Sequence, residues 1–412
     1  MKTIAVIGLG SRGTNYMRFV RLFNNKRARM VAICDVSEVK VKEVAKRYRI
    51  DPANCFTDEN EFFKEKRADA VFICTQDNDH YRNCMAALNL GYHILVEKPL
   101  SYNIAECEEI ERVAKEKNLN VVVCHVLRYS NYFSKMKELI RSGELGEIMT
   151  INHQENIANF HFAHSYVRGN WHKLETATPI LMAKCCHDID IISWLMEDEA
   201  EHVQSYGALT YFTEKNAPAG APKRCTDGCP VKECPYNAEY LYITAPPHKA
   251  TWLKYSHRIL TGKANSTKED VYNALKNGPY GVCVYHSDND VNDHQSLIMK
   301  FPGDRIATHT LTAFTDKFYR ETHITLTKGE IIGNTLNGKL KVHYFEGDRK
   351  KTIRTSLIQL PGHIEADMKL VNAFVSLLEG TLENMDDVTF VSATIPSHRT
   401  IVRSEESIKN WK

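Results

Sequence analysis

The chain lacks the features that mark membrane, secreted and nucleic-acid-binding proteins. No stretch approaches the run of about 18 apolar residues that spans a bilayer, so we expect no transmembrane helix. The apolar start at 4–7 soon gives way to Ser11 and Arg12 without a small-residue cleavage site, which predicts a buried strand and a cytoplasmic protein. The net charge is only +2, from 53 basic and 51 acidic side chains. We therefore expect no binding to nucleic acid or to an anionic membrane.

The composition is that of an ordinary globular protein. The chain has 412 residues, of which 43% are hydrophobic and 25% charged, and this length suggests two or three domains. Twelve cysteines without a secretion signal are typical of thiols or metal ligands rather than of a disulfide framework.

Residues 1–124 alternate short apolar runs with amphipathic stretches, a pattern typical of repeated strand–helix–strand units. Five runs are apolar throughout, as expected of parallel strands covered on both faces: 4–7, 30–33, 70–73, 94–96 and 121–123. Helices are predicted between them at 37–47, 57–66 and 103–117, the first two capped by Ser37 and Thr57. We therefore predict an α/β fold that begins with a Rossmann domain, a doubly wound parallel sheet, over 1–124.

The pattern changes after about residue 124, so 125–412 is predicted to form a second, α+β domain. Its alternating segments predict a largely antiparallel open sheet and span 148–157, 296–301, 306–312, 323–327, 330–334 and 339–344. A helix over 364–378 is expected to cover this sheet, and the basic triplet 349–351 is expected to lie in a solvated loop. Residues from about 213 to 285 are richer in Pro, Gly, Cys and Lys, which indicates an insertion.

A dinucleotide-binding fingerprint follows the first predicted strand. Gly8-Leu9-Gly10-Ser11-Arg12-Gly13 matches G-x-G-x-x-G, and Asp35 ends the next strand 22 residues after Gly13. The glycines permit a tight turn, close approach of a pyrophosphate and helix–strand packing, while the helix start supplies amide donors. A carboxylate at Asp35 would bind the ribose 2′-OH and repel a 2′-phosphate. The fingerprint therefore favours NAD over NADP.

Three further motifs accompany this fingerprint. Glu97-Lys98-Pro99 follows the fifth predicted strand, Thr75 to His80 (T-Q-D-N-D-H) follows the fourth, and His187-Asp188-Ile189-Asp190 lies in the second domain. Together they resemble the Gfo/Idh/MocA oxidoreductases over nearly the whole chain. The resemblance implies NAD(P)-dependent oxidation or reduction of sugars, cyclitols and their derivatives. It also implies a second domain whose open sheet often mediates oligomers, so we expect a homo-oligomer, either a dimer or a tetramer.

The resemblance and the motifs together assign a cofactor site. Its predicted members are Gly8, Gly10, Ser11, Arg12, Gly13, Asp35, Thr75, Asn78, His80, Glu97 and Lys98.

Two of the motif residues resemble the catalytic pair of the family. Lys98 is similar to the lysine that contacts the nicotinamide ribose and the substrate hydroxyl, and an ammonium there can stabilise a developing alkoxide. His187 is similar to the catalytic histidine, and a neutral imidazole can accept the hydroxyl proton. Many relatives carry an acid four positions before this histidine, where this chain has Ala183, followed by Lys184. Lys184 thereby becomes a candidate ligand for a substrate hydroxyl or carboxylate.

Other polar and aromatic residues suit a polyol, because aromatic faces stack on sugar C–H surfaces while polar groups bond hydroxyls. For each of them a structural role in a loop or strand is the alternative. With Lys184, the candidate substrate ligands are Arg128, Trp171, His172, Asp188, Asn292, Asp293 and His294.

The insertion contains a cysteine cluster. Cys225, Cys229 and Cys234 lie in a turn-rich segment, a spacing that is found in structural zinc sites. Cys283 is the first candidate for a fourth ligand, ahead of His286, Cys185 and Cys186. An iron–sulfur centre and ordinary thiols are the alternatives. The expected cofactors are therefore NAD and a structural zinc.

Three function classes remain open at this point. The first, which we favour, is an NAD-dependent dehydrogenase that converts a carbinol of a sugar, glycoside or cyclitol to a keto-sugar. The second is a redox-neutral NAD-dependent glycosidase of the same superfamily, and the third is a non-catalytic sugar or nucleotide sensor. Retention of both Lys98 and His187 argues against the sensor.

Overall fold

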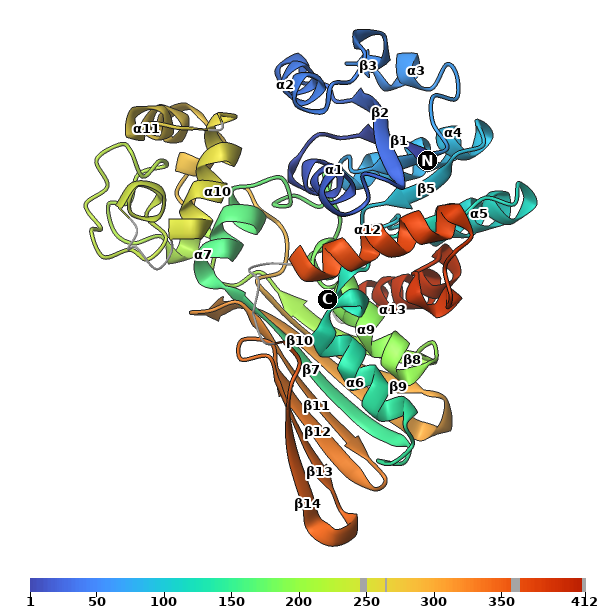
Figure 1. Ribbon diagram of the computed structural model, residues 1–412. Helices are drawn as coiled ribbons and strands as arrows, with labels where there is room; N and C mark the ends of the chain where they lie inside the picture. The colour runs from blue at the N-terminus through green and yellow to red at the C-terminus, as the bar shows by residue number, and fades with distance from the viewer. Residues whose placement is uncertain (245–249, 264, 357–363, 410–412) are drawn as a thin grey trace.

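A computed structural model describes residues 1–244, 250–263, 265–356 and 364–409. Figure 1 shows a smaller parallel sheet with its helices at the top and a large sheet at the bottom, with helices α12 and α13 between them. The segment that carries α10 (Ala250–Thr261) and α11 (Lys268–Asn277) projects to one side. Within these described ranges, no helix has both the length and the apolar character needed to cross a bilayer.

The first sheet confirms the predicted Rossmann fold. Its six parallel strands have the order β3-β2-β1-β4-β5-β6 and are β1 (Lys2–Ile7), β2 (Ala28–Cys34), β3 (Cys55–Phe56), β4 (Ala70–Ile73), β5 (His93–Val96) and β6 (Val121–Val123). Its helices are α1 (Ser11–Phe23), α2 (Glu38–Tyr48), α3 (Glu59–Phe62), α4 (His80–Asn89) and α5 (Ile104–Glu116). The strand order reverses between β1 and β4, and the carboxyl ends of strands at such a reversal are where open α/β sheets bind their ligands.

The predicted helix starts are largely correct. The Ser37 hydroxyl accepts a hydrogen bond from the Lys40 amide at the start of α2, at 3.5 Å. For α3 the cap is Asp58, whose carboxylate accepts from the Asn60 amide at 2.8 Å, and not Thr57 as predicted.

The second sheet has eight strands in the order β14-β13-β12-β11-β7-β10-β9-β8. They are β7 (Ile148–Ala158), β8 (His202–Ala208), β9 (His294–Phe301), β10 (Arg305–Thr315), β11 (Tyr319–Leu326), β12 (Gly329–Asn334), β13 (Lys339–Tyr344) and β14 (Arg349–Arg354). All neighbours are antiparallel except β7 and β10, which run parallel. The largely antiparallel sheet is therefore confirmed.

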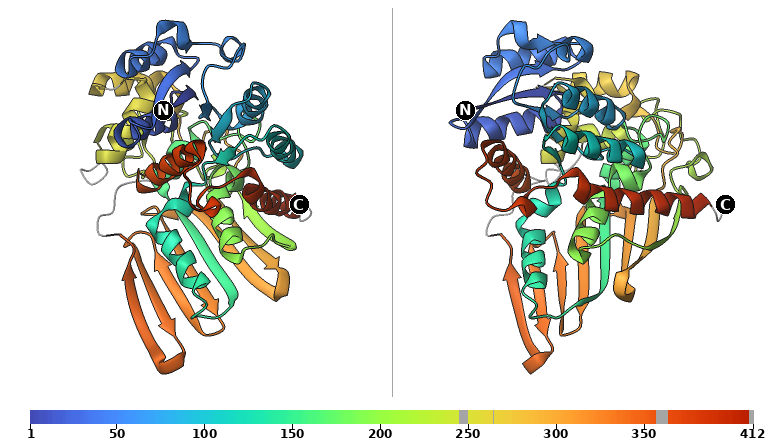
Figure 2. Two further views of the ribbon diagram at one scale, coloured as in Figure 1. Left: turned by 45° about the vertical axis from the view of Figure 1, so that its right-hand side comes forward. Right: turned by 90° about the vertical axis from the view of Figure 1, so that its right-hand side faces the viewer.

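One face of this sheet carries the core of the second domain. Helices α6 (Asn131–Arg141) and α9 (Cys186–Met196) pack on it, as Figure 2 shows. Along β9 every second side chain is exposed, so the opposite face meets solvent there. The basic triplet 349–351 lies in edge strand β14 and not in a loop, because its backbone pairs with β13. Lysines on such an edge discourage pairing with another chain.

The last two helices return to the first domain. Helix α12 (Ile364–Glu379) has the predicted extent, but its apolar residues join the core around β1 and α1 rather than covering the large sheet. Helix α13 (Val391–Lys409) contacts α5 of the first domain and also α9 and β8 of the second. The expectation for α12 was wrong because an amphipathic helix fits either apolar surface, and its sequence does not say which one.

Candidate functional site

The glycine-rich turn between β1 and α1 has the shape of a phosphate cradle. Gly8 has φ +88°, and a Cβ there would lie 2.3 Å from the Cys74 carbonyl oxygen. A Cβ on Gly13 would lie 2.1 Å from the Gly8 oxygen, so neither position has room for a side chain. A Cβ on Gly10 would meet nothing within 4 Å, which leaves open space beside the first amides of α1. The turn therefore fits the pyrophosphate of a dinucleotide, and Ser11 begins the helix beside it.

Asp35 lies beside this turn at the end of β2. One carboxylate oxygen accepts the Leu9 amide at 2.7 Å, and the other accepts the Ser37 amide at 2.9 Å. The Lys40 ammonium lies 3.6 Å from the carboxylate. These bonds fix the carboxylate next to the cradle, where the fingerprint predicts the ribose 2′-OH.

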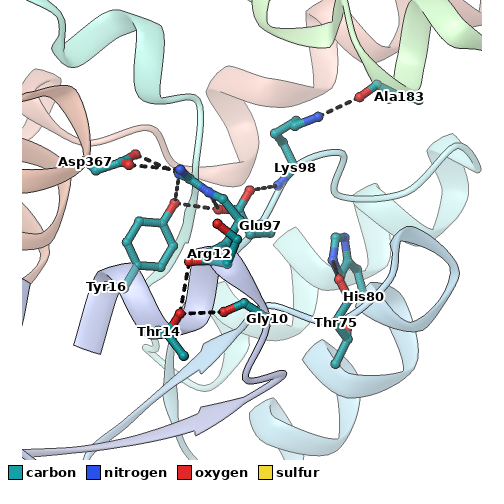
Figure 3. Close-up of polar contacts among 11 residues, drawn as sticks. Gly10, Arg12, Thr14, Tyr16, Thr75, His80, Glu97, Lys98, Ala183 and Asp367 are labelled. Carbon is teal, nitrogen blue, oxygen red and sulfur yellow. Dashed lines mark hydrogen bonds and ion pairs between the residues drawn. The ribbon is translucent and has the colours of Figure 1, made fainter. Parts of the chain in front are cut away.

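Arg12 and Glu97, both predicted to contact the cofactor, bond to each other. Arg12 Nε lies 2.6 Å from Glu97 Oε1, and both Arg12 Nη atoms bond Asp367 on α12 (Figure 3). Arg12 also donates to the Tyr16 hydroxyl. These polar groups thus join three elements of the fold, and their contact with a cofactor stays a prediction.

The loop after β4 lies against the loop after β5. His80 Nδ1 lies 2.6 Å from the Pro99 carbonyl oxygen, and His80 Nε2 lies 3.3 Å from that of Thr75 (Figure 3). Asn78 donates to the Thr176 carbonyl of the second domain at 3.3 Å. Buried His80 therefore sets the path of the backbone around Lys98, and Asn78 links the two domains.

Lys98 meets the second domain just before the predicted catalytic histidine. Its ammonium donates to the Ala183 carbonyl oxygen at 2.6 Å, as Figure 3 shows. Ala183 ends α8 (Ile180–Ala183), and His187 follows in the first turn of α9. Lys98 and Ala183 are 85 residues apart in the sequence, so the fold brings two distant segments together here.

The His187 ring is 7% exposed and packs edge-on against the ring of His125, with ring centroids 5.7 Å apart. Burial, followed by the charges of Arg128 and Lys98, lowers the pKa of His125 well below its usual value, so this ring is neutral at pH 7. Burial raises the pKa of the neighbouring Cys186 to about 12, so its thiol stays protonated. Sequence reasoning missed His125, although its place directly after β6, at the carboxyl edge of the sheet, was a usable signal.

A carboxylate near Lys184 comes from β7. Buried Glu155 lies 2.7 Å from the Lys184 ammonium and 3.0 Å from Arg320 Nε. Arg320 in turn lies 2.5 Å from Asp188, which also bonds His153 at 2.9 Å. Asp188 is completely buried in this network, so its carboxylate serves the core. The network balances two carboxylates against two cations, and its members on β7 and β11 carry no motif that a sequence search would find.

Aromatic side chains continue the ring of contacts from Lys184 back to the first domain. The Lys184 ammonium lies 5.4 Å from the centre of the Phe318 ring, and Phe318 neighbours His161 at 6.0 Å. Tyr166 packs between His161 and Trp171, and its ring centroid lies 6.2 Å from the ring centroid of each. Trp171 Nε1 donates to Asp77 of the first domain at 3.3 Å.

This aromatic wall, formed by His161, Tyr166, Trp171 and Phe318, includes a turn of π-helix at Ala163–Val167. Such turns are frequent at functional sites. Burial lowers the pKa of His161 to about 3 and raises that of Tyr166 well above its usual value, so both side chains are neutral. Sequence reasoning named only Trp171 of this wall, because nothing local distinguishes the other three from core aromatics.

The other predicted substrate ligands have structural partners. Arg128 bonds Asp190 through Nε and Nη2 at 2.7 and 2.6 Å. His172 Nδ1 lies 2.7 Å from the Gly169 carbonyl, and its Nε2 lies 3.4 Å from Asp288. Asp293 accepts the amides of Thr210 and Tyr211 and lies 2.7 Å from His294, while Asn292 bonds Gln295. Their contact with a substrate stays a prediction.

The four predicted zinc ligands Cys225, Cys229, Cys234 and Cys283 line one small pocket. Across the described ranges, however, no group of three or more His, Cys, Asp or Glu side chains is arranged to hold a metal ion. The zinc hypothesis is therefore not supported. Cys225 instead accepts a hydrogen bond from buried Arg168 at 3.7 Å, and Arg168 also donates to the Tyr236 and Val282 carbonyls. Arg168 thus ties the insertion to the end of the π-helical turn.

Comparison with known proteins agrees with this two-domain arrangement. Residues 2–125 match the model of an oxidoreductase family described as an NAD-binding Rossmann fold, and residues 137–356 match its C-terminal alpha/beta domain. The chain is 22% identical over 356 residues to YteT of Bacillus subtilis (strain 168), named as an oxidoreductase, covering 84% of this chain and 79% of that one. It is 26% identical over 208 residues to myo-inositol 2-dehydrogenase of Thermotoga maritima, covering 50% of this chain and 58% of that enzyme.

Among solved structures, the fold is similar to a levoglucosan dehydrogenase in complex with NADH and levoglucosan. The TM-score is 0.70 at 17% sequence identity, and the alignment covers 100% of this chain and 98% of that one. The two family models together account for most of the chain. The chain therefore belongs to the Gfo/Idh/MocA family of oxidoreductases, with an NAD-binding Rossmann domain.

Proposed function

We propose that this protein is an NAD-dependent dehydrogenase that oxidises a carbinol of an uncharged sugar, glycoside or cyclitol to the ketone. The observation that carries the proposal is the 2.6 Å contact of the Lys98 ammonium with the carbonyl of Ala183, four residues before His187. This contact brings the Lys98 side chain to the segment of the second domain that leads into His187. In the proposed oxidation the imidazole accepts the hydroxyl proton and the ammonium stabilises the developing alkoxide, while the hydride passes to NAD.

The roles of the two side chains follow from their chemistry. NAD, when bound, supplies the hydride acceptor. The Lys98 ammonium donates a hydrogen bond to the substrate hydroxyl oxygen and stabilises its developing negative charge. His187 accepts the hydroxyl proton as the C–H bond breaks, and the C–O bond becomes a carbonyl. The substrate thus loses one proton and one hydride, and the products are a keto-sugar, NADH and a proton that His187 releases to solvent.

The charge balance around Lys184 supports an uncharged substrate. Glu155 already neutralises Lys184 at 2.7 Å, so this ammonium is a hydroxyl donor rather than a spare charge for a carboxylate. The aromatic wall suits the C–H face of a pyranose or cyclitol ring. Relatives named as acting on myo-inositol and levoglucosan are in keeping with such a ring.

The test is reduction of NAD, followed at 340 nm, with a panel of free sugars, glycosides and cyclitols that includes myo-inositol and levoglucosan. We expect absorbance to rise with at least one member and to stay flat in the Lys98→Ala variant. Release of a free sugar from a glycoside without lasting NADH would contradict the proposal and favour the redox-neutral glycosidase. Homo-oligomer formation and a cytoplasmic location stay predictions from the sequence.

A further inference from the structure

A buried cluster joins helix α12 to Glu97, the residue before Lys98. The Arg12 fork donates to both oxygens of Asp367, at 2.8 and 2.7 Å, and its Nε lies 2.6 Å from Glu97 (Figure 3). The side chains of Asp367 and Glu97 are only 3% and 9% exposed. A bidentate guanidinium–carboxylate pair in such surroundings fixes direction as well as distance. Asp367 therefore sets the orientation of Arg12.

The cluster continues from Glu97 to the backbone of Lys98. One Glu97 oxygen accepts from Arg12 and, at 2.5 Å, from the Tyr16 hydroxyl. The other oxygen accepts the Lys98 amide at 3.3 Å. Burial raises the pKa of Glu97, but the Arg12 charge and the hydrogen bonds from Tyr16 and Arg12 outweigh burial and hold it below its usual value. The ionised state of Glu97 thus depends on Arg12 being in place.

We propose that Asp367 is a positioning residue for Lys98, acting through Arg12 and Glu97. When an amide replaces this carboxylate, Arg12 loses one of its two bonds to residue 367 together with the negative charge there, and its guanidinium turns toward solvent, since this side chain is already 31% exposed. Glu97 is then left buried without its cation and moves, and the Lys98 amide moves with it. The inference rests on the proposed role of Lys98 in the reaction.

The same helix offers a matched control. At its other end, Glu379 lies 2.7 Å from Arg27 of the first domain, with the two side chains 25% and 30% exposed. Both ion pairs connect α12 to the first domain, but only Asp367 connects to Glu97. Replacing a residue that only docks the helix should have the same effect as replacing Glu379. Replacing a positioning residue should also change the acetylation rate of Lys98.

The experiment compares full-length Asp367→Asn, Asp367→Glu and Glu379→Gln with the unchanged protein. One readout needs no substrate: the rate at which limiting acetic anhydride acetylates Lys98, measured by peptide mass spectrometry. The second is kcat with NAD and the best substrate of the panel, and the third is the melting temperature. If Asp367→Asn does not fold, Arg12→Lys takes its place, because lysine keeps the charge but not the fork.

We expect Asp367→Asn to raise Lys98 acetylation several-fold and to lower kcat by about 10- to 100-fold, as a small misplacement of a reacting group does. Asp367→Glu should bring the acetylation rate and kcat part of the way back to the values of the unchanged protein. Glu379→Gln should lower only the melting temperature. Unchanged acetylation of Lys98 in the Asp367 and Arg12 variants would overturn the inference. Raised acetylation with unchanged kcat would support positioning and would instead overturn the catalytic role of Lys98.

Discussion

Lys98 and His187 come from different domains, and each contacts at least one residue outside its own motif. The Ala183 carbonyl and Glu97 hold Lys98 from opposite sides, through its ammonium and its amide. The neutral ring of His125 packs against His187. The motifs predict the two reacting groups, and these neighbours fix the positions of their side chains.

Replacement of His187 by alanine tests its role as the base. We expect kcat to fall by at least about 10²-fold, because general acid–base groups contribute on that scale. NAD affinity, measured by quenching of protein fluorescence, should be retained, since the nucleotide cradle lies in the other domain. Unchanged turnover would move the base to another group, with Lys184 and His294 the next candidates.

We predict that the choice between NAD and NADP depends on Asp35. Its carboxylate is fixed by the Leu9 and Ser37 amides, so a 2′-phosphate would meet a negative charge that cannot turn away. We expect the unchanged protein to prefer NAD and Asp35→Ser to narrow the preference, because the neighbouring Lys40 then attracts the phosphate. The measurement is kcat/KM with NAD and with NADP for both proteins. Equal kcat/KM values in the unchanged protein would refute this reading.

The sequence predicted site residues correctly where a short motif fixes the local backbone conformation, as at Gly8, Gly13 and Asp35. It missed Glu155, Tyr166 and His161 because their roles arise from side-chain packing across strands and a π-helical turn. Local patterns carry no information on such pairing.

At the scale of elements, strands β7 and β11 and helix α9 are joined by the network of Glu155, Arg320, Asp188 and His153. Asp188 follows His187 directly, so the network also fixes the start of α9. Its carboxylate was expected to bind substrate, but its bonds to Arg320 and His153 serve packing.

Removal of the Arg320 charge should destabilise the protein. We expect Arg320→Met to lower the free energy of unfolding by about 3–5 kcal/mol at neutral pH, because two buried carboxylates lose their shared cation. The pKa of Asp188 is well below its usual value, so the stability that this ionised carboxylate contributes is present above its unfolded pKa and is lost as the pH falls through the folded pKa.

The difference between Arg320→Met and the unchanged protein should therefore shrink on acidification, as measured by urea unfolding at neutral and acidic pH. Exposed Lys42→Met, which breaks only the surface pair with Glu38, is the matched control and should change stability little. An equal loss in both variants would contradict a special role for the buried network.

The cysteine-bearing insertion shows the limit of spacing arguments. Four cysteines separated by up to 58 residues do line one pocket, yet their side chains do not form a metal-binding group in the described part of the chain. Spacing reports chain length and not the direction of the side chains. Stoichiometric zinc in protein purified without chelator would reopen the hypothesis.

At the scale of the whole molecule, helix α12, from late in the chain, packs against the first domain. The apolar face of α12, formed by Leu370, Val371, Phe374, Val375 and Leu378, completes the core beside β1 and α1. On the outer side of β6, the Val123 amide donates to the Thr389 carbonyl at 2.8 Å, and Val122 forms an antiparallel bridge with Phe390. The Rossmann domain is thus built from both ends of the chain.

Truncation after residue 356 should therefore disable the first domain. Each of the five buried side chains of α12 contributes about 1.5–3 kcal/mol, a sum comparable with the whole stability of a domain. We expect the truncated chain to lose NAD binding and cooperative thermal unfolding. Normal NAD affinity in a soluble 1–356 fragment would show that the first domain folds without α12.

By itself, the amino-acid sequence determined the Rossmann fold, six of the eight strands of the second sheet, the nucleotide cradle and the motif residues Lys98 and His187. These depend on local periodicity and on short motifs, which a chain carries wherever it folds. Only the tertiary structure decided that α12 packs on the first domain, that Glu155 neutralises Lys184, and that Arg12 turns to Glu97 and Asp367. Those outcomes depend on which apolar faces and charges meet across distant segments, and that choice is made by the packing of the whole chain.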